Sequence, residues 1–312
     1  MNLRIHGTTI EPGEQTTLDL SVGKLPSGTP ISVRVRVYRS AEAGPCVLVL
    51  AGVHGDEING VETVRRMIQN RLFERLERGS VIVIPVLNVY GFNNFSREVP
   101  DGKDVNRSFP GSTRGSLASR VARVVTKEIL PRVDFGVDYH TGGNAHYNYP
   151  QIRYTRQNAE ARRLAELFAA PFSVAKPAIT KSLRQTALKL GKTMLVYEGG
   201  ENLRLDGLSV ERGIRGLERL LHAHDMLAQA PEPRVPSHHI EKSGWTRATD
   251  AGMFQWVKQS GNPVRKDEIL GYLNDPHGGA ETPILAPTDG YLIGHTNAPV
   301  VSAGDALFHV GW

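Results

Sequence analysis

The chain has little cysteine and no long apolar run. Its 312 residues include one cysteine, Cys46, which excludes an intramolecular disulfide framework and suits a reducing compartment. Cys46 lies in the apolar run PCVLVLAG and is interpreted as a core strand residue rather than a nucleophile. No apolar stretch is as long as the roughly 18–20 residues that a helix needs to cross a bilayer. The first ten residues, MNLRIHGTTI, lack the apolar core of a secretory signal. We expect a cytoplasmic protein without a membrane partner.

A dense basic block is absent too. The net charge of +5 favours anionic partners, but lysine and arginine are scattered along the chain and accompany no nucleic-acid-binding module. We therefore expect a small anionic substrate and no nucleic acid. An RNA-associated basic protein is kept as an alternative, which predicts an affinity that falls steeply with salt.

Low-complexity segments and clear internal repeats are also missing. The hydrophobic content of 40% and charged content of 22% are those of a globular chain, and the length fits an α/β domain of about 200 residues with a smaller companion.

What is present is a strand and helix pattern. ISVRVRVYRS alternates as a half-exposed strand, and from Cys46 onward continuous apolar strands are separated by helices. Such strands imply a mixed, largely parallel sheet sandwiched by helices, hence an α/β fold. The expected strands are CVLVLAGV, SVIVIPVLNV, VDFGVDYH and TMLVYEGG, and the expected helices span about 57–78, 116–130, 158–170 and 208–228.

The last quarter of the chain has a different pattern. QAPEPRVPSHHI is rich in proline and aperiodic, and the short apolar pieces after it are punctuated by glycine and proline. We predict a domain at 1–230, a linker at 231–240 and a small all-β barrel at 241–312. Its ILAPTDGYLIG is similar to lipoyl and biotinyl carrier domains, yet LNDPHGGAETPIL has no lysine to carry a cofactor. The barrel is interpreted as a covering domain that narrows the mouth of the pocket or supports assembly, and not as a swinging arm.

Three predicted strands end in side chains that can bind a metal or transfer a proton. The first ends in His54 and Glu57, another in Asp138 and His140, and a third in Glu198. Ligands of open parallel sheets lie outside the carboxyl ends of the strands. A set of two histidines and one glutamate suits zinc and leaves a coordination position for water. His54 and Glu57 alone would be weak evidence, because such a pair often arises by chance.

Four sequence blocks together resemble the succinylglutamate desuccinylase and aspartoacylase family, which shares its fold with zinc carboxypeptidases. They are GVHGDEING, REVPDGKDVNRSFPG, DYHTG and YEGG, in order over about 45–200. The resemblance implies one zinc ion per chain held by His54, Glu57 and His140. It also implies a zinc-activated water as nucleophile and Glu198 as general base.

The resemblance assigns further roles. Arg97 would polarise the scissile carbonyl, Asn106 and Arg107 would bind a substrate carboxylate, and Asp104 would orient a zinc-binding histidine. Simple solvated charges would also explain Arg97 and Arg107, and a capped turn would explain Asp104. Arg184 is a candidate substrate contact, because it precedes the strand of Glu198.

Other residues are open to two interpretations. Asp138 either orients His140 or bonds to a neighbouring loop, and His146 either lines the pocket or is structural. His222 and His224 are expected to point to different sides of their helix, so we do not expect them to share a metal. His238 and His239 are expected to be solvated.

The sequence thus predicts a zinc-dependent deacylase that cleaves the amide of a small N-acyl amino acid. The alternatives are a metallocarboxypeptidase or ester hydrolase with the same site, and a carboxylate-binding protein without turnover. Homo-oligomerisation is possible on base rates alone.

Overall fold

A long mixed sheet runs through the computed structural model, which describes residues 3–312. Its centre is parallel, in the order β10 (Thr193–Glu201), β7 (Phe135–Gly142), β5 (Cys46–Ala51) and β6 (Ser80–Ile84). Antiparallel strands extend it on both sides, with β4 (Pro30–Arg39) and β3 (Gln15–Lys24) beyond β6, and β8 (His146–Tyr154) beyond β10. The predicted mixed sheet is confirmed, with four parallel strands at its centre.

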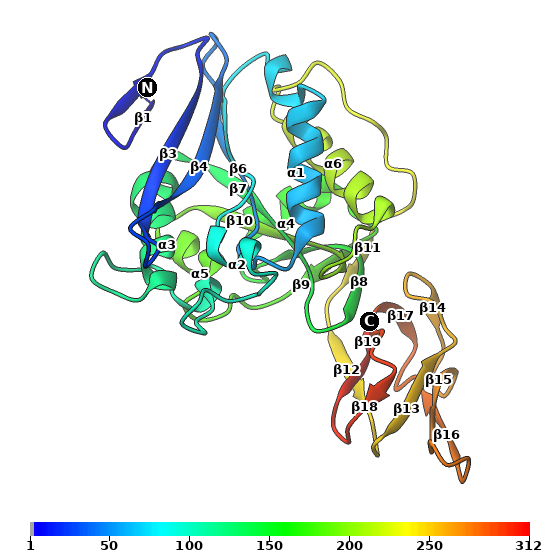
Figure 1. Cartoon of the computed structure of the whole chain (residues 1–312). Coiled ribbons are helices and arrows are strands. Elements are labelled where there is room, and N and C mark those ends of the chain that lie inside the picture. Colours follow the sequence, from blue (N-terminus) through cyan, green and yellow to red (C-terminus); the bar gives the residue numbers. More distant parts are fainter. Residues whose placement is uncertain (1–2) are drawn as a thin grey trace.

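Helices cover both faces of the sheet because the central strands are apolar on both sides. In β5, Leu48 and Leu50 face one core and Val47 and Val49 face the other, since alternate strand residues point in opposite directions. The first core contains residues of α3 (Leu117–Val124) and α5 (Leu183–Lys189). The second contains residues of α1 (Ile58–Gln69), α4 (Ala159–Phe168) and α6 (Gly207–His222). Figure 1 shows the two groups on opposite sides of the strands.

Several connections carry short elements. After α1 the chain forms a 3-10 turn at Leu72–Arg75, so the helix predicted at 57–78 is shorter than expected. Helix α2 (Val89–Asn93) and the 3-10 turn η2 (Val105–Arg107) lie between β6 and α3, and the end of α3 continues through Val125–Ile129 and Leu130–Arg132. Strands β1 (Leu3–Ile5) and β2 (Thr8–Ile10) form a separate hairpin. Among the described residues, no helix is long and apolar enough to cross a membrane.

The C-terminal segment does not form a closed barrel, which corrects the sequence prediction. Strands β12 (Ser243–Arg247), β19 (Ala306–Gly311) and β17 (Gly290–Thr296) continue the main sheet, because β17 pairs with β8. The opposing layer is a four-stranded sheet of β16 (Glu281–Leu285), β15 (Ile269–Asn274), β13 (Gly252–Trp256) and β18 (Val300–Val301). The C-terminal segment has an apolar core of its own between these two layers, which includes Phe254, Leu270 and Phe308.

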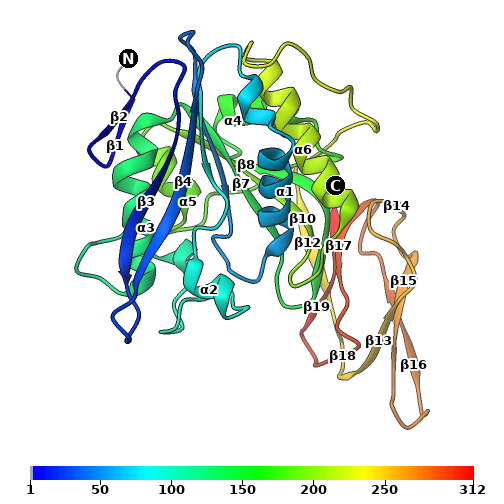
Figure 2. The same cartoon turned by 45° about the horizontal axis from the view of Figure 1, so that its top comes forward.

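The chain enters this segment through another strand. β11 (His238–Ile240), at the end of the predicted linker, pairs with β9 (Phe172–Ala175), and β9 in turn pairs with β8. The short β14 (Pro263–Val264) pairs with β17. Figures 1 and 2 show the C-terminal strands projecting from one end of the molecule, with β3 and β4 at the other end.

Candidate metal and catalytic site

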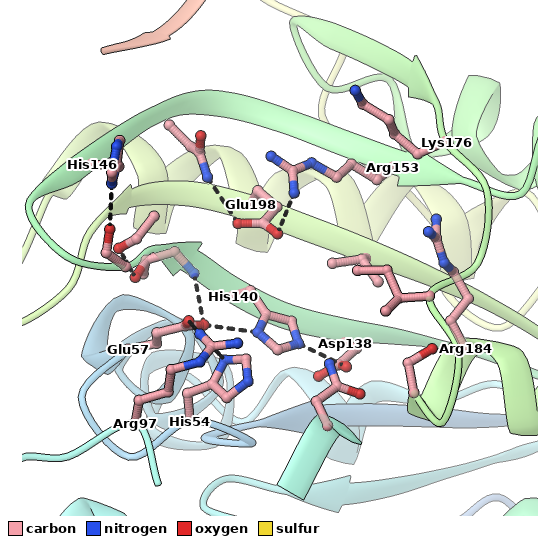
Figure 3. A pocket seen from close by; sticks show the side chains of 18 of the residues that line it. His54, Glu57, Arg97, Asp138, His140, His146, Arg153, Lys176, Arg184 and Glu198 are labelled. Atoms are coloured by element: carbon pink, nitrogen blue, oxygen red, sulfur yellow. Dashed lines mark hydrogen bonds and ion pairs between the residues drawn. The ribbon is translucent and has the colours of Figure 1, made fainter. Parts of the chain in front are cut away.

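His54, Glu57 and His140 meet at the carboxyl ends of β5 and β7. Nδ1 of His54 lies 2.7 Å from Glu57 Oε1, and Nδ1 of His140 lies 2.7 Å from Glu57 Oε2. One ligand atom from each residue lies within 4.8 Å of the others, and all three residues are buried. Figure 3 shows the three side chains converging from different strands and loops. The structure therefore brings together the three metal ligands that the sequence proposes.

A glycine allows the turn that carries two of these ligands. A Cβ on Gly55 would lie 1.9 Å from the carbonyl carbon of Gly91, so any side chain there would collide with the backbone of α2. The turn thus packs directly on a neighbouring segment, which fixes the backbone between His54 and Glu57.

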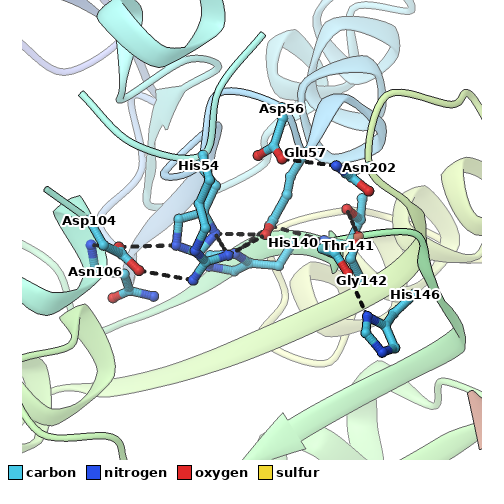
Figure 4. A network of polar contacts seen from close by, with 12 residues as sticks. His54, Asp56, Glu57, Asp104, Asn106, His140, Thr141, Gly142, His146 and Asn202 are labelled. Atoms are coloured by element: carbon cyan, nitrogen blue, oxygen red, sulfur yellow. Dashed lines mark hydrogen bonds and ion pairs between the residues drawn. The ribbon is translucent and has the colours of Figure 1, made fainter. Parts of the chain in front are cut away.

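Two carboxylates orient the imidazoles. Nε2 of His54 lies 3.2 Å from Asp104 Oδ1, and Nε2 of His140 lies 2.9 Å from Asp138 Oδ2. If each Nε2–H donates to its carboxylate, each Nδ1 keeps a lone pair that faces Glu57. Asp104 also accepts from the backbone N–H of Asn106 at 2.6 Å, so it both caps η2 and contacts His54 (Figure 4). Of the two interpretations of Asp138, the structure shows the contact with His140.

The charges of this cluster are strongly coupled. Burial by itself would raise the pKa of Glu57, but His54 and His140 outweigh it and hold that pKa well below its usual value. Burial opposes protonation of His140, yet Asp138 and Glu57 raise its pKa well above that of a free imidazole. The cluster therefore favours a cation between its members. An ionised carboxylate with two imidazoles is the donor chemistry of a catalytic divalent metal.

Arg97 lies against the same cluster. Its NH1 is 3.1 Å from Glu57 Oε1 and 3.1 Å from His54 Nδ1, and its NH2 donates to Asp104 Oδ2 at 2.9 Å. The guanidinium is thus directly beside the metal ligands and is no solvated surface charge. It also lines the cavity into which the cluster faces.

Three further residues proposed from the sequence line the same cavity: Asn106 and Arg107 of η2, and Arg184 of α5. The side-chain oxygen of Asn106 accepts from the backbone N–H of Leu183 at 2.9 Å, which turns its NH₂ group to other partners. Arg107 is exposed, and its NH1 donates to the Asn106 carbonyl at 2.9 Å. Arg184 is buried, and its NH2 donates to the Pro177 carbonyl at 2.6 Å.

Glu198 has two partners that sequence reasoning missed. Its Oε2 accepts from Asn148 Nδ2 at 2.9 Å, and its Oε1 accepts from Arg153 NH1 at 2.8 Å. Both partners belong to β8, which lies antiparallel to the strand of Glu198. The available signal was their polar character inside HYNYPQIRY, an otherwise strand-like stretch directly after DYHTG. They hold the carboxylate of Glu198 by both oxygens.

One cavity of about 460 Å³ is lined by the ligand cluster, by Arg97 and Glu198, and by Asn106, Arg107 and Arg184. The C-terminal segment contributes Trp245 and His309 to its wall, with the two rings stacked at 4.6 Å. His146 also lines the cavity, and its ring meets Trp245 edge-on at 5.1 Å. Trp245 and His309 are thus the residues with which the C-terminal segment contributes to the pocket.

The other histidines stand apart from this site. Nδ1 of His222 and of His224 each contact a different backbone carbonyl, at 2.8 Å. His238 of β11 is half-buried and stacked on Tyr291 of β17, so it is not the solvated residue that the sequence predicts. His239 is exposed, as predicted, and contacts Glu241.

The family model of the succinylglutamate desuccinylase/aspartoacylase catalytic domain matches residues 43–224. The chain belongs to this family. Its matched region contains both histidines and both glutamates of the site. Trp245 and His309 lie beyond that region.

Individual family relatives extend the similarity over almost the whole chain. The N-alpha-acetyl-L-2,4-diaminobutyric acid deacetylase of Halomonas elongata is 26% identical over 293 residues, covering 89% of this chain and 84% of that protein. The crystal structure of a succinylglutamate desuccinylase/aspartoacylase from Rhodobacter sphaeroides matches with a TM-score of 0.84 and 26% identity, over 95% of this chain and 94% of that one. The product-bound ectoine utilization protein EutE (DoeB) of Ruegeria pomeroyi has the same fold, with a TM-score of 0.83 at 23% identity over 96% of this chain and 94% of that one.

Proposed function

We propose that the protein is a zinc-dependent hydrolase that cleaves the amide bond of a small N-acyl amino acid. The observation that carries the proposal is the buried His54, Glu57 and His140 cluster, in one cavity with the carboxylate of Glu198. Membership of a family named after two deacylases supports the reaction class.

Zinc is the metal that this ligand set fits best. Two imidazole nitrogens and one carboxylate, each imidazole held by a further carboxylate, are typical of catalytic zinc sites with an open position. Zinc bound there would lower the pKa of a water to about 7 and polarise a carbonyl oxygen. The likeness to zinc carboxypeptidases that the sequence suggests is part of this proposal.

The residues of the chain supply the remaining steps. Glu198 takes a proton from the attacking water on a carboxylate oxygen and passes it to the nitrogen of the leaving amine. Asn148 and Arg153 fix the position of Glu198 while it does so. Arg97 donates to the carbonyl oxygen as negative charge develops there. Asn106 and Arg107 bind the carboxylate of the amino acid by paired N–H donors.

We propose that residues 1–230 form the catalytic unit and that 241–312 restrict what enters. Trp245 and His309 close one side of the cavity, which favours a small substrate over a protein or long peptide. A carboxypeptidase or an ester hydrolase would use the same metal ligands, and the product formed separates these reactions.

The test combines a substrate panel with a variant of the general base. Zinc-loaded protein is assayed with N-acetyl and N-succinyl amino acids, dipeptides and esters, with and without a chelator. We expect hydrolysis of the acyl amino acids, abolished by the chelator. Glu198→Gln should lower kcat by about 10²–10⁴-fold while zinc stays bound.

The control is Glu166→Gln on the exposed surface of α4, which should leave activity unchanged. Turnover by Glu198→Gln at the parent rate would refute the assigned base. A parent protein that binds acyl amino acids without hydrolysing them would instead establish the non-catalytic alternative.

A further inference from the structure

The segment that follows β10 returns to the turn that carries the first two proposed metal ligands. Nδ2 of Asn202 donates to Asp56 Oδ2 at 2.9 Å, and the backbone N–H of Leu203 donates to the Asp56 carbonyl at 2.9 Å. Asp56 is buried and stands directly before Glu57 in the chain. Figure 4 shows the Asn202 amide pointing at the Asp56 carboxylate. Two successive residues thus hold the turn, one by its side chain and one by its backbone.

Asn202 also holds the segment that follows His140, the third proposed ligand. Its backbone N–H donates to the Gly142 carbonyl, at the end of β7, at 2.8 Å. Its Oδ1 accepts from the backbone N–H of Ala145 at 3.3 Å. One residue therefore connects the ligand turn to the end of the strand that carries the third ligand. These two segments have to keep a fixed separation if one ion is to reach all three ligand atoms.

The described residues offer no second amide for this position. The Asn202 amide is the one described side chain that donates to the Asp56 carboxylate, and Asp56 Oδ1 is buried without a partner among these residues. A buried carboxylate that loses its remaining side-chain donor has to turn toward water, which would displace the backbone beside Glu57. Neither Asn202 nor Asp56 lines the cavity, so the displacement would reach a substrate only through the metal ligands.

The C-terminal segment secures this contact. Nδ2 of Asn297 donates at 2.6 Å to Oε2 of Glu201, the buried neighbour of Asn202 in the chain. Its Oδ1 accepts from Trp256 Nε1 at 2.9 Å, and its backbone N–H donates to the Ala145 carbonyl at 2.7 Å. Asn297 thus fixes two of the segments that surround the Asn202 side chain.

We propose that Asn202 is a positioning residue, which clamps the turn at Asp56 to the end of β7 and keeps the metal ligands together. Asn297 holds this clamp in place from the C-terminal segment. The inference rests on the proposed function and deepens it. It gives the C-terminal segment a part in metal binding, in addition to its place in the cavity wall.

Zinc affinity tests the clamp without any turnover. Asn202→Ala removes the amide and should weaken zinc binding by about 10–100-fold, measured by competition with a chelating dye. At saturating zinc, kcat should fall by up to about 10²-fold while KM stays within about twofold, because the clamp does not touch the cavity. Asn70→Ala is the matched control, since this exposed asparagine lies at the far end of α1 and should change none of these values.

Exchanging the two partners separates the hydrogen bond from a general loss of packing. Asp56→Asn combined with Asn202→Asp keeps the net charge, the donor and the acceptor. We expect this double variant to bind zinc within about threefold of the parent, far more tightly than Asn202→Ala does. A role in folding alone predicts lower stability of metal-depleted Asn202→Ala in urea with the zinc affinity of the parent. That result would overturn the proposal.

Asn297→Ala tests the link to the C-terminal segment. It should weaken zinc binding by about 2–30-fold in the parent. In the Asn202→Ala background it should add less than about twofold, because it acts through the same clamp. Parent zinc affinity in Asn297→Ala, or an effect that adds in full to that of Asn202→Ala, would overturn the proposal.

Failure of the proposed function has a separate result. A parent protein that binds no metal would refute the proposed function and the clamp together. Zinc affinities that follow the expected order, in a protein that hydrolyses no acyl amino acid, would refute the reaction alone and leave the clamp standing.

Discussion

At the scale of single residues, the site depends on carboxylates that fix the positions of its imidazole rings. Glu57 contacts both imidazoles through its two oxygens, and each imidazole contacts a second carboxylate on its far side. A buried imidazole without such a partner could rotate or change its tautomer, and the lone pair that faces Glu57 would then be lost.

Asp138→Asn tests this arrangement at one residue. The amide can still occupy the position near His140, but its oxygen is neutral and a weaker acceptor than the carboxylate at 2.9 Å. We expect zinc affinity to fall by about 10–100-fold, measured by competition with a chelating dye. Asp101→Asn, on the exposed loop, is the matched control. Unchanged affinity in Asp138→Asn would show that Asp138 has no part in orienting the ligand.

The residue scale also shows what the sequence can and cannot reveal. His54, Glu57 and His140 could be predicted because each follows a strand whose apolar pattern is unambiguous, and parallel strands end at one edge. Asn148 and Arg153 could not, because strand periodicity gives the face of a residue and not its partner across the sheet. Arg97 was identified as a site residue, yet its contacts with Glu57 and Asp104 depend on how its loop folds over the cluster.

At the scale of elements, the turn between β5 and α1 is the most constrained part of the site. Gly55 lies against the backbone of α2, and a Cβ on Gly60 in α1 would lie 2.6 Å from the Tyr139 carbonyl of β7. The helix and the strand are thus in direct backbone contact, which sets the distance between the ligands that they carry.

Gly55→Ala should therefore damage both stability and metal binding. The added methyl would lie 1.9 Å from the Gly91 carbonyl carbon, so the turn or α2 must move. We expect a loss of about 3 kcal/mol in the free energy of unfolding, measured by urea denaturation, and weaker zinc binding. Gly207→Ala is the control, since nothing lies within 4 Å of its added Cβ. Equal stability of the two variants would contradict the tight packing at Gly55.

Element boundaries were harder to predict than element types. The stretch at 57–78 has helical periodicity throughout, yet α1 ends at Gln69 and a 3-10 turn follows, because Arg71 adopts a left-handed conformation with φ of 54°. The C-terminal strands were correctly expected to be short, but a strand pattern does not say which sheet the strand joins. β17 pairs with β8 instead of closing a barrel.

At the scale of the whole molecule, the pairing of β8 with β17 joins the C-terminal segment to the main sheet. His295 of β17 is paired with Tyr147 of β8, its ring lies 5.3 Å from that tyrosine ring, and its Nδ1 lies 2.6 Å from Ser260 Oγ. Burial is the main cause that lowers the pKa of His295 to about 4.

This pKa predicts how stability depends on pH. The unfolded chain protonates His295 near pH 6.5 and the folded chain near pH 4, so the folded state loses stability as the pH falls through this window. Between pH 7.5 and pH 4.5 we expect His295 to account for about 2–3 kcal/mol of lost unfolding free energy. Urea denaturation of the metal-depleted parent and of metal-depleted His295→Gln, each at pH 7.5 and at pH 4.5, measures how much unfolding free energy each protein loses. Parallel losses in the two proteins would exclude this role of His295.

The central claim is that His54, Glu57 and His140 bind one metal ion that the reaction requires. The most direct measurement is the zinc content of dialysed protein, taken with its rate of N-acyl amino acid hydrolysis, for the parent, His140→Ala and His146→Ala. His146 lines the same cavity outside the ligand cluster, so it controls for loss of an imidazole. We predict about one zinc per chain in the parent and in His146→Ala, and almost none, with no turnover, in His140→Ala. Full zinc content and full activity in His140→Ala would contradict the account.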